Sequence, residues 1–173
     1  MEKTIKKVLF ATDLTPEAKH VFEYVKKIVA STGASVTVVH ILEKVNKGTD
    51  EMLAHFLGEK NWKQFRKDKF EKAESLMIGK IHENRLIREA IDCFLENIKC
   101  EEEKQIEDKI IVEEGVPAEK IIELAKINNC EVIVMGREKR SVLGMSYLGG
   151  TLKDVIRRSE IPVLTVPYEN DKS

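Results

Sequence analysis

Residues 7–42, KVLFATDLTPEAKHVFEYVKKIVASTGASVTVVHIL, decide the fold class because the spacing of their apolar residues changes twice. The first run, Val8 to Ala11, is short and apolar, and it leads to Asp13. From Ala18 onward, apolar residues recur at steps of three and four, as on a helix with one buried face. The run Ser35 to Leu42 is β-branched and nearly all apolar, as in a parallel strand covered on both faces. The stretch predicts a strand, a helix starting with Thr15-Pro16 as N-cap and first residue, and a second strand.

The same order of elements returns in the last third of the chain. Strands are predicted at residues 109–113, 131–135 and 163–166, helices at 118–128 and 152–158, and a glycine-punctuated loop from Gly136 to Gly150. A parallel crossover between neighbouring strands needs a helix and is nearly always right-handed. Five strands alternating with helices therefore predict an α/β fold: an open, doubly wound, parallel five-stranded sheet with helices on both faces, a Rossmann-like arrangement.

The 173 residues have the length of one compact domain, which we place at residues 1–168, with a flexible tail at 169–173. Residues 43–108 form a charged stretch without strand patterns that is too long for a plain loop, so we expect a long helical segment there. One of its helices should pack on the sheet before the third strand. The segment also carries the only tryptophan, Trp62.

Composition excludes several classes of function. Lysine and arginine total 29 against 30 acidic residues, and a net charge of −1 gives no overall attraction to nucleic acid or to an anionic membrane. The apolar runs are far shorter than the roughly 20 residues that cross a bilayer, and no signal peptide is recognisable, so we expect a cytoplasmic protein. The four histidines lack metal-ligand spacing and, His40 in its strand included, are expected to have a satisfied packing or surface role, so no metal site is predicted.

The ends of the predicted strands carry the candidate functional residues. In an open parallel sheet, ligands bind beyond the carboxyl ends of the strands, where the strand order reverses. Strand one ends near Asp13, strand two at His40-Ile41 and strand four at Met135-Gly136, which the glycine loop follows. A carboxylate can accept hydrogen bonds from a ribose or a base, and a glycine loop that opens onto a helix N-terminus can hold phosphate. These are the parts of a nucleotide pocket.

Four separated segments of the chain resemble the universal stress protein family. They are Val8 to Asp13, Gly115 to Ala118, Val134 to Gly136, and the C-terminal stretch with Gly149-Gly150, Asp154 to Arg157 and Pro162 to Val166. The resemblance implies a five-stranded domain of the adenine nucleotide alpha hydrolase-like kind, usually dimeric. One branch of that family binds ATP and another does not.

The resemblance also implies a set of nucleotide-binding residues. The ATP-binding branch has a glycine, two residues, a second glycine, nine residues, then a glycine followed by serine or threonine. Gly136 matches the first position and Gly149 the third, whereas Lys139 replaces the second glycine and Gly150 the hydroxyl residue, with Thr151 next. Asp13 matches the family's strand-one aspartate, and Ile41 the strand-two position whose backbone meets adenine.

The residues themselves leave the phosphate contacts open. A lysine with the positive φ of a loop glycine costs on the order of 1 kcal/mol, so Lys139 predicts a different loop shape. Arg137, Lys139 and Arg140 would place three cations near the phosphates, or they form an ordinary solvated loop. Asp13 could bind a nucleotide or simply tether the helix that follows.

Two functions follow from this. The first is a stress-response regulatory module that binds ATP or AMP, with or without Mg, and acts by conformation or partner binding. Its binding residues would be Asp13, Ile41, Gly136, Arg137, Lys139, Arg140, Gly149, Gly150 and Thr151. The alternative is a nucleotide-independent protein-interaction module, because Lys139 and Gly150 depart from the motif. No catalytic residue can be named, so at most slow ATP hydrolysis is expected. A homodimer through the last strand, Val163 to Val166, is predicted, together with an unidentified protein partner, and neither nucleic acid nor membrane.

Overall fold

The protein folds as a parallel sheet between two layers of helices. The computed structural model describes residues 4–43, 48–70, 80–98, 108–139, 141–142, 145–146 and 148–169, so residues 170–173 of the expected tail lie outside. The strands are β1 (Lys7–Ala11), β2 (Ser35–Leu42), β3 (Asp108–Glu114), β4 (Val132–Glu138), β5 (Ser141–Val142), β6 (Met145–Ser146) and β7 (Val163–Tyr168). The helices are α1 (Ala18–Thr32), α2 (Thr49–Leu57), α3 (Glu59–Phe70), α4 (Lys80–Ile98), α5 (Pro117–Ile127) and α6 (Gly150–Arg158).

Five strands form the main sheet in the order β3-β2-β1-β4-β7, and each neighbouring pair is parallel. Val8 of β1 lies opposite Val36 of β2 on one side and opposite Val132 of β4 on the other. The predicted doubly wound α/β fold is confirmed. The strand order reverses between β1 and β4, so the carboxyl ends of these two strands mark the switch point at which such sheets bind ligands.

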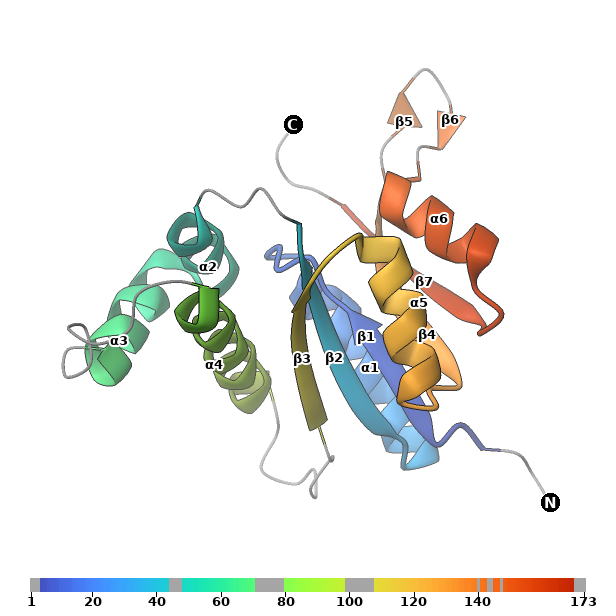
Figure 1. Ribbon diagram of the computed structural model, residues 1–173, viewed down its shortest axis with the longest axis horizontal. Helices are drawn as coiled ribbons and strands as arrows, with labels where there is room; N and C mark the ends of the chain where they lie inside the picture. The colour runs from blue at the N-terminus through green and yellow to red at the C-terminus, as the bar shows by residue number, and fades with distance from the viewer. Residues whose placement is uncertain are drawn as a thin grey trace.

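Alternating side chains of each strand supply two separate cores. Val8 and Phe10 of β1 face a core shared with α1, α2, α3 and α4, whereas Leu9 and Ala11 face a core shared with α5 and α6. Figure 1 shows α5 and α6 in front of the sheet and α1 behind it. A strand buried on both faces must be apolar at nearly every position, which explains the continuous apolar runs in the sequence.

The helices between β2 and β3 join the core on the α1 side. Ring contacts run from Phe10 of β1 to Phe22 of α1 at 5.6 Å between centroids, on to Phe94 of α4 at 6.1 Å, and to Phe56 of α2 at 4.7 Å. Trp62 is buried and stacks on Phe65 within α3. None of the helices among the described residues is long and apolar enough to cross a membrane.

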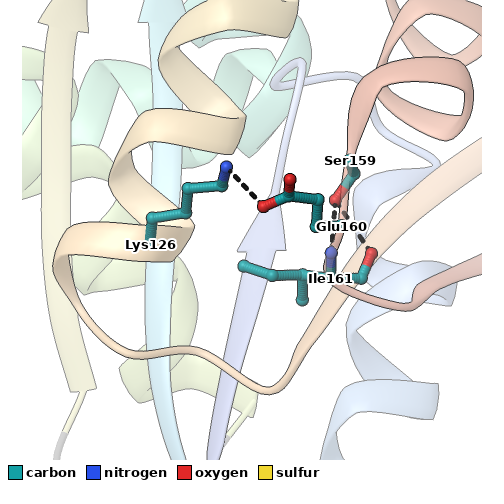
Figure 2. Close-up of polar contacts among 4 residues, drawn as sticks. All are labelled: Lys126, Ser159, Glu160 and Ile161. Carbon is teal, nitrogen blue, oxygen red and sulfur yellow. Dashed lines mark hydrogen bonds and ion pairs between the residues drawn. The ribbon is translucent and has the colours of Figure 1, made fainter.

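Polar contacts fix the connection between α6 and β7 (Figure 2). The Ser159 hydroxyl donates to the Ile161 carbonyl oxygen at 2.8 Å and accepts from the Ile161 amide at 3.0 Å. Lys126 of α5 donates to Glu160 at 2.8 Å, and this hydrogen bond lowers the pKa of the exposed Glu160 carboxyl. The turn after α6 is thereby attached to α5, its neighbour in the same layer.

Three local expectations were wrong. Helix α1 begins at Ala18 rather than after Thr15, because the Thr15 hydroxyl bonds Asp13 and not a helix amide. Strand β4 continues past Met135 to Glu138, because its polar end pairs with the last residues of β7. The loop after it contains a short antiparallel hairpin of β5 and β6, which projects beyond α6 at the top of Figure 1.

Candidate functional site

A cavity of about 470 Å³ lies at the carboxyl ends of β1, β2 and β4. Its volume falls within the roughly 300–1,000 Å³ of small-molecule sites. The lining includes Phe10, Val21 and Met52 from the core on the α1 side, and Ile41, Ile121, Met135 and Leu152 from the core on the α5 and α6 side. The cavity therefore reaches over the strand ends and touches both helical layers.

Seven of the nine predicted site residues line this cavity. They are Asp13, Ile41, Gly136, Arg137, Gly149, Gly150 and Thr151. Lys139 is absent from the lining, and its ammonium group pairs with Glu169 at 3.2 Å on the exposed surface. Arg140 lies outside the described residues. Of the three predicted phosphate cations, the structure thus places Arg137 at the cavity.

A tight corner follows β1 at the cavity wall. The Thr12 hydroxyl accepts from the Leu14 amide at 3.1 Å, and Asp13 Oδ1 accepts from the Thr15 amide and hydroxyl at 3.2 and 2.9 Å. Leu14 has a left-handed backbone, with φ of 58°, and its side chain is 2% exposed. Burial and these hydrogen bonds hold a conformation that leucine rarely adopts. Asp13 therefore does tether the chain before α1, while its Oδ2 accepts no hydrogen bond from the described residues.

His40, which sequence reasoning assigned to packing, also lines the cavity and is 5% exposed. Its Nδ1 lies 2.9 Å from the Thr12 carbonyl oxygen, and its buried Nε2 has no hydrogen-bond partner among the described residues. Burial lowers the pKa of the ring, and the Thr12 carbonyl and the Asp13 charge oppose this only in part. The expectation of a fully satisfied histidine was therefore wrong. Its position near the end of an apolar strand was the sequence signal that could have identified His40 as a lining residue.

Gly136 lies within β4 and has no positive φ, so its role differs from that of a loop glycine. A Cβ atom there would lie 2.8 Å from Cε1 of Tyr168 and 3.1 Å from Cγ2 of Val21. The missing side chain leaves room for the Tyr168 ring, another lining residue that sequence reasoning missed. Lys139 has no positive φ either, because its amide donates to the Tyr168 carbonyl oxygen in the extended ladder. The chain at Lys139 thus avoids the positive φ of a loop glycine, in agreement with the different loop shape expected there.

The N-terminus of α6 opens onto the cavity through Gly149, Gly150 and Thr151. Gly149 provides no side-chain cap, so the first amides of the helix are left for solvent or a ligand. A Cβ atom at Gly149 or Gly150 would meet no atom of the described residues within 4 Å, its chain neighbours and the backbone of α6 apart. Unlike Gly136, neither glycine is required by packing.

The model of the universal stress protein family matches residues 4–167. The chain belongs to the universal stress protein family. It is 27% identical to Universal stress protein MJ0577 of Methanocaldococcus jannaschii over 98% of this chain and 99% of that protein. The family resemblance read from the sequence is confirmed.

Solved structures of universal stress proteins share this fold. The structure of MJ0577 aligns with a TM-score of 0.58 and 24% identity, covering 98% of this chain and 100% of that one. A universal stress protein in complex with cAMP aligns with a TM-score of 0.57 and 17% identity, covering 95% and 98%. One from Archaeoglobus fulgidus gives 0.56 and 22%, covering 98% and 46%. Because each of these three structures is less than 25% identical to this universal stress protein, the likeness shows a shared fold and nothing more.

Proposed function

We propose that this universal stress protein binds an adenine nucleotide, ATP or AMP, in the cavity and acts by conformation or partner binding. The observation that carries the proposal is the cavity at the switch point of the sheet, which opens onto the uncapped N-terminus of α6. A helix N-terminus with free amides and a positive dipole end attracts phosphate. The complex of a relative with cAMP, itself an adenine nucleotide, supports the same ligand class.

The residues that line the cavity suit different parts of a nucleotide. The phosphates would lie against Gly149, Gly150 and Thr151, where the described residues leave the space beside the two glycines open. Arg137, at the end of β4, adds a cation to the cavity lining. Oδ2 of Asp13 would accept from a ribose hydroxyl, and the apolar end of β2 at Ile41 would contact the base. In this orientation the phosphate oxygens meet backbone amide donors, and the ribose hydroxyl meets a carboxylate acceptor.

Nucleotide binding is tested by thermal denaturation with and without millimolar Mg-ATP. A ligand that binds the folded state stabilises it by RT ln(1 + [L]/Kd), so the melting temperature should rise. Gly149→Val should reduce this rise by weakening binding on the order of tenfold, because its side chain occupies the approach to the helix amides. Lys153→Ala, an exposed change on α6 away from the cavity lining, should keep the full rise.

Two results would contradict the proposal. An unchanged melting temperature of the wild type with both ATP and AMP would favour the nucleotide-independent interaction module. Equal rises in the wild type and Gly149→Val would place the phosphates away from α6.

The second part of the proposal is a homodimer through β7, which lies at an edge of the sheet. Its pairing with β4 includes the Ile133 amide bonded to Pro162 and the Lys139 amide bonded to Tyr168. In a parallel ladder alternate residues bond to one neighbour, so the backbone groups of Val163, Thr165 and Pro167 point to the open edge. Pro167 has no N–H, so a second copy would find amide donors at Val163 and Thr165 only.

We expect a dimeric mass by light scattering after size exclusion at micromolar protein. Thr165→Pro should shift the mass to that of the monomer, because it removes an outward amide without removing a bond to β4. Thr165→Val, which keeps the amide, should stay dimeric. A monomeric wild type, or a dimeric Thr165→Pro, would overturn this part of the proposal.

A further inference from the structure

His40 lines the cavity, and one nitrogen of its buried ring has no hydrogen-bond partner among the described residues. The Thr12 carbonyl oxygen can only accept, so Nδ1 at 2.9 Å must carry the ring hydrogen. The other nitrogen, Nε2, then has a lone pair and no hydrogen. Because Thr12 is itself held by a hydrogen bond from its amide to Val39 at 2.9 Å, the ring has a fixed anchor.

An acceptor that is buried without a partner reduces stability, and a donor that reaches it removes that cost. His40 lies on the α1 side of β2 with Val38 and Leu42, since strand residues alternate between faces. Met52 lines the cavity on that same side. Nε2 is covered from water in the structure, so a ligand reaches it only when a neighbouring side chain moves. Met52 is unbranched and flexible, as such a movement requires.

We propose that His40 determines ligand specificity in this cavity: its Nε2 accepts a hydrogen bond from an amino or hydroxyl group of the nucleoside part of the ligand. The inference rests on the proposed nucleotide function and adds a requirement to it. The ligand must carry a donor at the β2 end of the cavity.

The same chemistry sets the direction in which the ligand binds. Phosphate oxygens at neutral pH are acceptors and would repel the lone pair of a neutral imidazole. They belong at the α6 end, where the backbone amides are donors. The donors of an adenine nucleotide are the exocyclic amino group and the ribose hydroxyls, and both are at the other end of the molecule. One of these groups is therefore the partner of Nε2.

The test is a set of double-mutant cycles in which calorimetry measures Kd for the wild type and His40→Asn. The Asn amide can replace Nδ1 as donor to Thr12 but has no atom at the Nε2 position. The ligands are ATP, purine riboside triphosphate, which lacks the amino group, and the 2′-deoxy and 3′-deoxy forms of ATP. His40→Asn should weaken ATP binding about 3- to 10-fold, the size of one neutral hydrogen bond.

With the wild type, one analogue should bind more weakly than ATP by this same factor. With His40→Asn, that analogue and ATP should bind equally well. The group missing from that analogue is then the donor to Nε2. If the losses multiply for every analogue, the assignment of His40 is overturned while nucleotide binding stands. If the wild type binds none of the four ligands, the proposed function fails and this inference fails with it.

A second measurement on the wild type avoids dependence on the variant. Nitrogen-15 spectra of the histidine rings should show one ring with hydrogen on Nδ1 in the free protein. Saturating ATP should shift its Nε2 resonance upfield, in the direction of hydrogen-bond acceptance. A ring with hydrogen on Nε2, or an Nε2 resonance unmoved by bound ATP, would overturn the inference.

Discussion

Replacing Phe94 with alanine is expected to lower the free energy of unfolding by about 3 to 5 kcal/mol, measured by urea denaturation. Phe94 is 3% exposed, and its ring contacts Phe22 of α1 and Phe56 of α2. Alanine would leave a cavity between these rings and also remove the buried apolar surface of the ring. It would thus break the ring contacts that connect α2 and α4 with α1.

The matched control is Arg88→Ala, an exposed change on the same helix, which should alter stability by about 0.5 kcal/mol or less. Hydrogen exchange should show faster opening of α2 in Phe94→Ala than in the control, because α2 loses a packing partner. If Phe94→Ala cost no more than Arg88→Ala, the ring contacts would not hold the middle helices in place.

The second large effect is expected at Gly136, where alanine should destabilise the protein by about 1 to 3 kcal/mol. The new methyl group would overlap the Tyr168 ring, with 2.8 Å to its Cε1, and would press on Val21 at 3.1 Å. Because the closest overlap is with the Tyr168 ring, the cost should shrink when Tyr168→Ala is made first. A double-mutant cycle by urea denaturation measures this difference.

Gly149→Ala is the control for that experiment, since its methyl group would clash with none of the described residues and its φ of −54° suits alanine. It should leave stability nearly unchanged. Equal costs for Gly136→Ala with and without the Tyr168 ring would show that the glycine is needed for another reason, such as the backbone.

The sheet could be predicted from the sequence because burial on both faces leaves a local signal. Ser35 to Leu42 must be apolar almost throughout, and no distant contact is needed to recognise it. The end of β4 gave no such signal. Arg137 and Glu138 are polar, and they are strand residues only because Pro167 and Tyr168, thirty positions later, pair with them.

The candidate site could also be predicted only where it follows from the pattern of single segments. Residues near the ends of apolar runs, such as Asp13 and Ile41, could be placed together from topology alone. The need for glycine at position 136 could not be predicted in this way, because it depends on the ring of Tyr168 in another strand. The unpaired nitrogen of His40 likewise depends on where the Thr12 carbonyl lies. Such features come from contacts between segments, not from the pattern of one segment.

The left-handed leucine at position 14 limits how this corner can change during evolution. Glycine would relax the backbone at φ of 58° but would empty a fully enclosed position, whereas isoleucine would fill the space but resist that φ. Substitution at position 14 is therefore restricted both by the backbone conformation and by the buried volume that the side chain must fill. Homologues that replace the leucine should carry a compensating change either in the turn beside it or in the core beneath it.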